Sequence, residues 1–130
     1  MSTTPPRPQK SIFIADDDPR VRSALRALIE ADPRFDVVGE ASSVQEVEER
    51  IGAPMPAIVL VDMLFPTASE GLRLVKHLVA RSGCAVVAIS AQDSLRGAAL
   101  RAGAVLFLHK GEAPDTILAA LYAASDQVCR

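Results

Sequence analysis

Residues 57–62 read AIVLVD, and this short segment decides how the chain is interpreted. Five consecutive apolar residues without alternation are typical of a strand that helices cover on both faces of a parallel sheet. The segment ends on Asp62, where the strand reaches the edge of the sheet. Because it is the most hydrophobic strand of the chain, we expect it to be the central one.

The rest of the chain alternates similar apolar segments with segments of helical period. The five predicted strands are residues 11–15, 35–40, 57–61, 84–89 and 104–108. Apolar stripes and capping signals predict a helix from Pro19, one from Ser43 to about Ile51, one around residues 72–79, a weaker one over 94–102 and one from Pro114. This strict alternation predicts an α/β fold, a doubly wound parallel sheet with helices on both faces.

The composition is that of a single globular domain and excludes several classes of protein. The chain has 130 residues, 49% of them hydrophobic, and a formal net charge of −2. It has no apolar run of about 18 residues and no secretory signal, so we expect a cytoplasmic protein without membrane contact. Cys84 and Cys129 form no disulfide framework or metal motif. The near-neutral charge argues against direct nucleic-acid binding by this chain.

The proline-rich start of the chain differs from the remainder. Residues 1–9 hold three of the nine prolines and almost nothing apolar, so we predict a flexible tail there. The folded domain is predicted to span residues 10–130.

Polar residues follow four of the predicted strands. They are the acidic run Asp16, Asp17 and Asp18, then Asp62, Ser90 and Lys110. Ligands of doubly wound sheets bind outside the carboxyl ends of the strands, so these side chains are expected to lie together. Asp18 directly precedes a proline at the start of a helix, and for it we favour a role as the helix cap.

This combination of groups favours phosphoryl chemistry. Gathered carboxylates repel one another unless a cation lies among them, and Mg²⁺ prefers oxygen ligands. Mg²⁺ and Lys110 would neutralise a phosphoryl group, and the Ser90 hydroxyl would donate a hydrogen bond to it. Asp62, at the end of a rigid central strand, is the expected nucleophile. Each residue alone has an ordinary structural explanation, and their joint occurrence at the strand ends is what favours a site.

The other reactive side chains are weaker candidates. His77 lies in a predicted helix and His109 precedes Lys110, and neither has a second histidine or a cysteine at metal-ligand spacing. Cys84 begins a buried strand and Cys129 lies at the end of the chain. We therefore expect structural or surface roles for these four residues.

With these segments in this order, the chain resembles the response-regulator receiver domains of two-component signalling, most closely those of LuxR-type, NarL-like regulators. The segments that carry the resemblance are IFIADDDPRVR, AIVLVDMLFP, VVAISA and GAVLFLHKG, in the family's order, and the match covers about residues 10–124. It implies a flavodoxin-like (CheY-like) fold with the strand order 2-1-3-4-5.

The resemblance also implies a mechanism. Asp62 would accept a phosphoryl group from a sensor histidine kinase, a phosphotransfer protein or a small acyl phosphate. Asp16, Asp17, Asp62 and the backbone carbonyl of Leu64 would bind Mg²⁺, with Asp16 acting mainly through water. Ser90 and Phe107 would act as the switch pair, and Lys110 would contact the phosphoryl group.

The output expected from the resemblance is a changed surface. Phosphorylation would alter the face formed by the fourth helix, the fifth strand and the fifth helix. This face would control an output domain or partner, or it would form the contact of a homodimer. Candidate contacts on this face are Arg96, Arg101, Ala119 and Tyr122. The chain would catalyse only its own phosphorylation and dephosphorylation. The absence of a helix-turn-helix after the last helix predicts a stand-alone receiver or a piece of a longer transcription regulator.

The sequence departs from the family pattern at two loops. Residues 62–71, DMLFPTASEG, carry Phe65 where methionine is usual and place Gly71 one residue late. Lys110 is followed by Gly111 in place of the frequent proline, and a cis peptide without proline costs about 2.5–4 kcal/mol, so the family's cis bond is not carried over to this position. We hypothesise that apolar Leu64, which with Gln92 flanks the approach of water, slows loss of the phosphoryl group, so dephosphorylation would be faster in Leu64→Asn.

Two other interpretations stay open at this stage. A phosphohydrolase of the haloacid-dehalogenase type would use Asp16 and Asp18 as its acidic motif, but it needs a further acidic pair after the lysine. Only Glu112, Asp115 and Asp126 follow, and none is paired. The second alternative is a receiver-like interaction module that is never phosphorylated.

Overall fold

The computed structural model describes residues 9–52, 54–81 and 83–127. The predicted tail up to residue 8, and Cys129, lie outside these described residues. Gln9, the last residue of that predicted tail, is bound to the domain, because its Nε2 donates hydrogen bonds to the carbonyls of Pro33 and Phe35, both at 3.1 Å.

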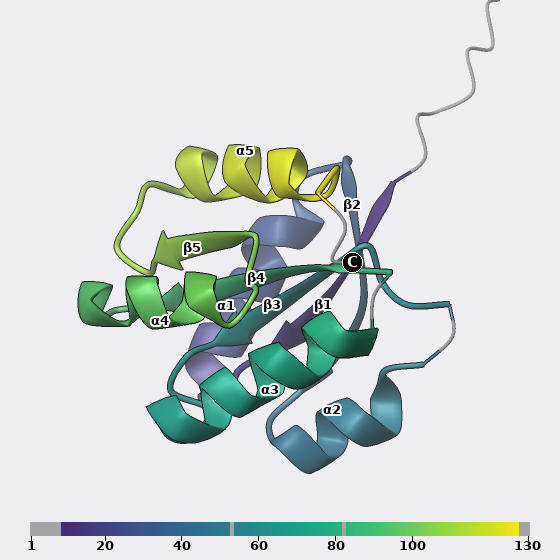
Figure 1. Ribbon diagram of the computed structural model, residues 1–130. Helices are drawn as coiled ribbons and strands as arrows, with labels where there is room; N and C mark the ends of the chain where they lie inside the picture. Colours follow the sequence, from purple (N-terminus) through teal and green to yellow (C-terminus); the bar gives the residue numbers. More distant parts are fainter. Residues whose placement is uncertain (1–8, 53, 82, 128–130) are drawn as a thin grey trace, which may run out of the picture.

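A single parallel sheet forms the centre of the molecule (Figure 1). Its strands are β1 (Lys10–Ala15), β2 (Phe35–Ala41), β3 (Ile58–Asp62), β4 (Ala85–Ser90) and β5 (Leu106–His109). The order is β2-β1-β3-β4-β5, which confirms the predicted fold and the central position of the strand that ends at Asp62. Every residue of β3 and β4 is buried, as expected for strands covered on both faces.

Helices cover the sheet on both sides (Figure 1). α1 (Pro19–Glu30) and α5 (Pro114–Ala124) pack on one face, where Leu25, Ile29 and Leu121 belong to one apolar core. α2 (Val44–Arg50), α3 (Ala68–Arg81) and α4 (Arg96–Arg101) cover the other face over a second core. No helix in the described part of the chain is long and apolar enough to cross a membrane.

The structure corrects three local predictions. The fifth strand is residues 106–109 and not 104–108, because Gly103, with φ +110°, and Ala104, whose N–H bonds to the Ala99 carbonyl, complete the turn that ends α4. The helix predicted over 94–102 begins as a 3-10 turn at residues 93–95 and is α-helical only over 96–101. Ser43 caps α2, as its capping-box spacing with Glu46 predicts, but the Glu46 carboxylate accepts hydrogen bonds from the N–H and the hydroxyl of the preceding residue, Ser42.

Candidate functional site

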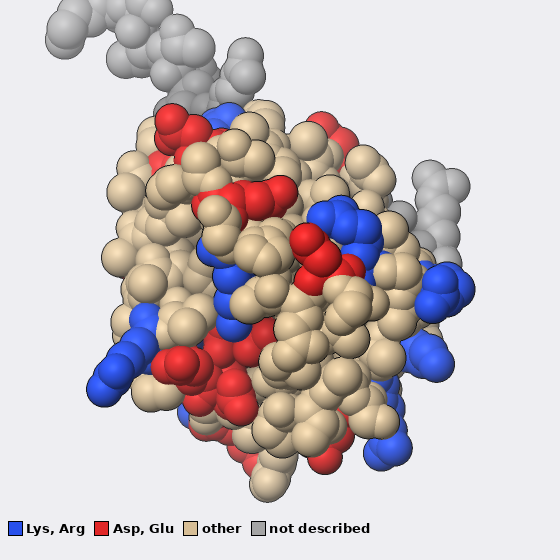
Figure 2. Space-filling model, turned by 90° about the vertical axis from the view of Figure 1, so that its left-hand side faces the viewer, with Lys and Arg blue, Asp and Glu red and all other residues tan. Residues whose placement is uncertain are grey.

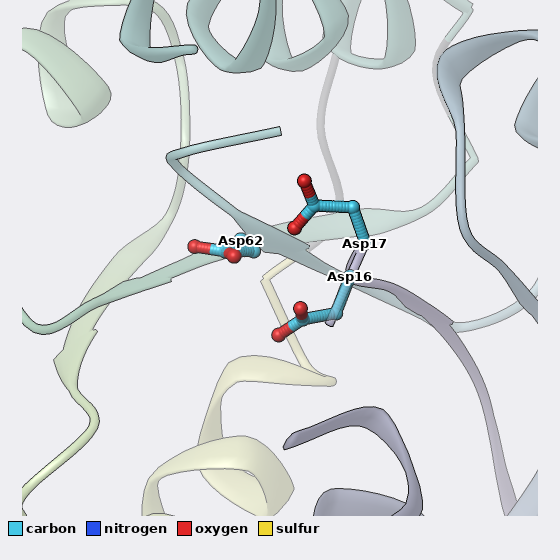
Figure 3. A group of neighbouring side chains, drawn as sticks. All are labelled: Asp16, Asp17 and Asp62. Carbon is cyan, nitrogen blue, oxygen red and sulfur yellow. The ribbon is translucent and has the colours of Figure 1, made fainter. Parts of the chain in front are cut away.

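Three carboxylates meet at the edge of the sheet where β1 and β3 end. Asp16 and Asp17 follow β1, Asp62 is the last residue of β3, and these strands are neighbours. One carboxylate oxygen from each lies within 4.8 Å of the others, and Figure 3 shows the three side chains together at the ends of these strands. Asp16 and Asp62 are buried and Asp17 is exposed, so the cluster opens to solvent on one side. The predicted acidic residues are therefore brought together.

Lys110, the residue directly after β5, lies against the cluster. Its Nζ lies 3.2 Å from an oxygen of Asp62 and 3.4 Å from an oxygen of Asp16. Its backbone N–H donates to the Ser90 carbonyl at 3.0 Å, which extends the pairing of β4 and β5 by one residue. Figure 2 looks onto this edge of the sheet and shows acidic side chains gathered beside basic ones. One ammonium group against three carboxylates leaves a negative site that favours a cation.

The environment of Asp62 disfavours its charged form. Burial raises the pKa of the Asp62 carboxyl above its ordinary value, and the charge of Asp16 raises it further. The Leu64 N–H and Lys110 act in the opposite direction without cancelling this effect. A divalent cation among the three carboxylates would remove this repulsion, and oxygen donors suit a hard ion. Asp16, Asp17 and Asp62 are the side chains that fit such an ion.

Hydrogen bonds hold the loop between β1 and α1. One oxygen of Asp16 accepts from the Asp18 N–H at 2.9 Å, and Asp18 accepts from the Arg20 N–H at 2.9 Å. Asp18 is the N-cap of α1 and Pro19 begins the helix, which confirms the predicted cap. Asp18 is thus outside the carboxylate cluster, although it is adjacent to it in the sequence.

The loop after Asp62 folds inward. The Leu64 N–H donates to Asp62 Oδ1 at 3.2 Å, and Phe65 is fully buried. Among the described residues, Phe65–Pro66 is the cis peptide bond, so Lys110–Gly111, whose isomer the sequence left open, is trans. The one-residue-longer loop is therefore packed into the core at its middle.

Gly71 lets α3 approach this loop. A Cβ at position 71 would lie 2.2 Å from the carbonyl oxygen of Met63. We expect Gly71→Ala to lower the free energy of unfolding by about 2 kcal/mol, because the backbone there must shift. Gly97→Ala is the matched control: its Cβ would meet only the end of the flexible Arg101 side chain, at 3.0 Å. Urea denaturation measures both, and equal stability of the two variants would contradict this packing argument.

The predicted switch residues lie on β4 and β5. Ser90 is fully buried, and its hydroxyl accepts a hydrogen bond from the Gln92 N–H at 3.0 Å. Phe107 is buried in the core under α4, and the Arg96 guanidinium lies 4.8 Å from its ring centre. Such a cation–ring contact contributes about 0.5–1 kcal/mol at an exposed position. Arg96, expected as a surface contact, therefore also covers Phe107.

His109 connects two loops at this edge. Its Nε2 lies 3.0 Å from the carbonyl oxygen of Ala91, and its Nδ1 accepts from the Gly111 N–H at 2.8 Å. His109 is thus a structural residue, as the sequence indicated. His77 is exposed on α3.

Sequence reasoning missed one side chain that reaches the acidic loop. Arg22, in the second turn of α1, donates from Nη1 to the Asp16 carbonyl at 2.8 Å and pairs with Glu40 at the end of β2. Glu40 carried no distinctive signal in the sequence. The available signal was positional: an arginine one turn after a helix cap, in an element that packs beside that strand end.

The fold and the site together define a class: doubly wound α/β domains with an acidic, lysine-containing site at the carboxyl edge of the sheet. Residues 12–122 match the family model described as response regulator receiver domain. The chain belongs to this family. Membership excludes the phosphohydrolase interpretation, which is consistent with Asp18 capping a helix.

Relatives and solved structures agree with this assignment. The chain is 35% identical over 96 residues to the DNA-binding transcriptional activator DevR/DosR of Mycobacterium tuberculosis, covering 72% of this chain and 44% of that protein. It is 33% identical over 111 residues to a protein-glutamate methylesterase/protein-glutamine glutaminase of Myxococcus xanthus, covering 81% and 31%. The signal receiver domain of NarL from M. tuberculosis superimposes with a TM-score of 0.82 at 26% identity, covering 92% of this chain and 99% of that one. The chain thus spans less than half the length of these two relatives.

Proposed function

We propose that this receiver domain is a switch that accepts a phosphoryl group on Asp62 and is controlled by a sensor histidine kinase or a phosphotransfer protein. The observation that carries the proposal is the position of Lys110 Nζ, 3.2 Å from Asp62 and 3.4 Å from Asp16, beside the exposed carboxylate of Asp17. A phosphoryl transfer needs a cation-binding acidic pair, a nucleophile and a positive charge around one point, and this arrangement of side chains supports the proposal.

Each side chain has a separate task in the transfer. An oxygen of Asp62 attacks the phosphorus, a P–O bond to that oxygen forms, and the P–N bond of a phosphohistidine or the P–O bond of an acyl phosphate breaks. Lys110 pairs with a phosphoryl oxygen, and the Ser90 hydroxyl donates a hydrogen bond to another. Asp16, Asp17, Asp62 and the Leu64 carbonyl would hold Mg²⁺, which neutralises the charge of the phosphoryl oxygens.

The proposal extends to the output. The buried Phe107 and the overlying Arg96 connect the site edge to the face of α4, β5 and α5, where phosphorylation would change contacts with an output domain, a partner or a second copy. The DNA-binding relative supports transcription regulation as the role of a longer protein. We infer a cytoplasmic switch that acts only on its own Asp62, without contacting nucleic acid or membrane itself.

The test is phosphorylation by a small donor. The protein is incubated with acetyl phosphate and Mg²⁺ and its intact mass is measured. A gain of one phosphoryl group that disappears when EDTA replaces Mg²⁺ is the expected result. Absence of the adduct, together with absence of beryllofluoride binding, would favour the second interpretation, an interaction module that is never phosphorylated.

A further inference from the structure

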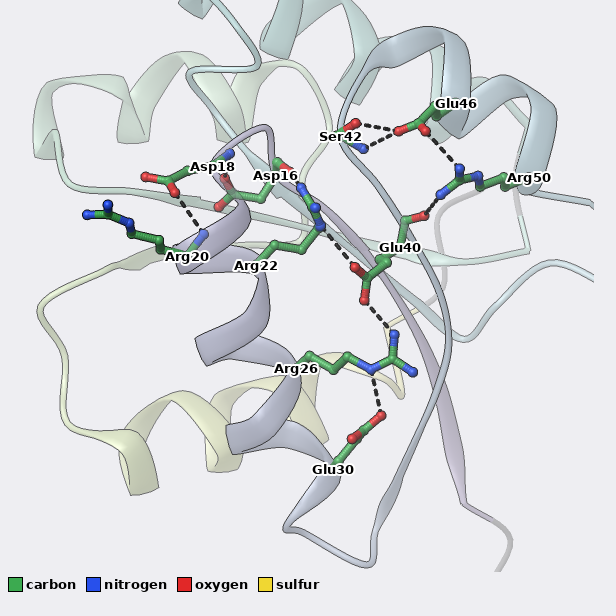
Figure 4. A network of polar contacts seen from close by, with 10 residues as sticks. All are labelled: Asp16, Asp18, Arg20, Arg22, Arg26, Glu30, Glu40, Ser42, Glu46 and Arg50. Carbon is green, nitrogen blue, oxygen red and sulfur yellow. Dashed lines mark hydrogen bonds and ion pairs between the residues drawn. The ribbon is translucent and has the colours of Figure 1, made fainter.

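The acidic loop is held from behind by a side chain of α1. Arg22 Nη1 donates a hydrogen bond to the backbone carbonyl of Asp16 at 2.8 Å, and its Nε donates to Glu40 Oε1 at 3.0 Å (Figure 4). The Arg22 side chain is only 17% exposed. Its planar guanidinium thus bridges the loop after β1 and the end of β2 through two separate N–H groups.

Glu40 is itself fixed by neighbours on two helices. Its Oε2 accepts from Arg26 on α1 at 2.5 Å, and its backbone carbonyl accepts from Arg50 on α2 at 2.8 Å. Hydrogen bonds from Arg26 and then Arg22 hold the pKa of the Glu40 carboxyl below its ordinary value. Glu40 therefore stays an anion at neutral pH and presents a fixed acceptor to Arg22.

Asp16, whose backbone carbonyl Arg22 holds, is repelled by a second buried carboxylate. Asp16 is 1% exposed and lies against Asp62, so two buried carboxylates repel each other in the metal-free protein. The hydrogen bond from the Asp18 N–H fixes one carboxylate oxygen, and Lys110 faces the other. Arg22 fixes the backbone from which both Asp16 and Asp17 project.

We propose that Arg22, oriented by Glu40, is a positioning residue that holds the Asp16–Asp17 segment in its metal-binding geometry before the metal arrives. This inference rests on the proposed Mg²⁺ site. A site held in place loses little conformational freedom on binding, so the restraint raises its affinity. The Arg22–Glu40 pair thus joins α1 and β2 to the chemistry at the ends of β1 and β3.

Substitution of Arg22 removes both a charge and a hydrogen bond, and these two losses change the affinity for Mg²⁺ in opposite directions. Removing a cation close to Asp16 makes the site more negative, which by itself strengthens Mg²⁺ binding. Removing the hydrogen bond loosens the loop and weakens binding. Arg22→Lys separates the two effects, since lysine keeps the charge but lacks the planar fork that reaches Asp16 and Glu40 together.

The experiment measures the dissociation constant of Mg²⁺ by isothermal titration calorimetry. We expect Arg22→Lys to raise it roughly tenfold, the effect of losing one hydrogen bond from a charged donor, and Arg22→Met to raise it less, because the lost charge partly offsets the lost bond. Arg34→Met is the matched control, because Arg34 forms an ion pair with Asp32 and has no bond to Asp16 or Glu40 among its described contacts, and less than about a twofold change is expected. Hydrogen exchange of the Asp18 amide in the metal-free protein should be faster in both Arg22 variants and unchanged in Arg34→Met.

The outcomes separate this inference from the function on which it rests. If the wild type binds Mg²⁺, Asp17→Asn abolishes binding and neither Arg22 variant weakens it, the positioning role is overturned and the Mg²⁺ site stands. Wild-type behaviour of Arg22→Lys would also overturn it, since charge alone would then suffice. If the wild type binds no Mg²⁺, both fail. Should Arg22→Met not fold, Arg22→Lys and Arg34→Met carry the same comparison.

Discussion

Asp62→Asn is expected to abolish the phosphoryl adduct formed with acetyl phosphate and Mg²⁺. The amide that replaces the carboxylate is a poor nucleophile and a weaker cation ligand, while the buried volume at the end of β3 stays nearly the same. Intact-mass measurement after incubation reports the adduct directly. Asp18→Asn is the matched control, because Asp18 caps α1 and asparagine caps a helix equally well. An adduct that persists in Asp62→Asn would remove this residue from the role of acceptor.

The same substitution should stabilise the metal-free protein. Burial and Asp16 raise the pKa of Asp62 in the folded state, so the folded protein binds more protons than the unfolded chain between the ordinary aspartate pKa and the raised one. The stability of the wild type therefore falls as pH rises through that window, and asparagine removes this loss. Thermal melts in EDTA should show a Tm a few degrees higher for Asp62→Asn at pH 7, with the difference shrinking at acidic pH. An unchanged Tm at pH 7 would show that Lys110 already compensates the charge.

Lys110→Ala is expected to reduce the rate of phosphorylation by about 10²–10³-fold, the typical effect of removing a charged group that stabilises developing negative charge. Lys110 Nζ is the ammonium within 3.4 Å of both Asp16 and Asp62. The initial rate of adduct formation at saturating Mg²⁺ measures the effect. Lys76→Ala, on the exposed side of α3, is the matched control and should phosphorylate as the wild type does.

A second variant distinguishes charge from position at Lys110. Lys110→Arg keeps the positive charge on a longer, planar group, so it should recover only part of the rate. Equal rates in Lys110→Ala and the wild type would mean that the lysine compensates the carboxylates in the resting protein without contributing to the transfer.

The sequence was sufficient to predict the fold because its apolar segments, its helix caps and the alternation of strands and helices all indicate the same parallel sheet. AIVLVD is typical of a strand covered on both faces, and it lies at the centre of the sheet. Once the strands are parallel, the residues at their carboxyl ends must share one edge, so the meeting of Asp16, Asp62 and Lys110 followed from topology.

What escaped prediction depends on side chains that bridge different elements. Nothing in the order of residues pairs Arg22 with Glu40, because the contact depends on how closely α1 packs beside β2. The same holds for Glu46, which bonds to Ser42 because the chain turns there at the end of β2. The predicted start of β5 was wrong because Ala104 and Val105, which precede the strand, are as apolar as the residues of the strand itself.

The His109 contacts explain the glycine that follows Lys110. A proline at position 111 has no N–H, so it would leave His109 Nδ1 without the donor that it has here. A Cβ at this position would also lie 2.9 Å from that nitrogen. His109 and Gly111, on either side of Lys110, are therefore joined by a hydrogen bond that proline could not make. His109 also contacts the carbonyl of Ala91, which connects the loop after Ser90 to the loop that carries the lysine. The Ser90 hydroxyl and the Lys110 ammonium group are thus carried by two loops that His109 joins, so a displacement of one loop moves the other.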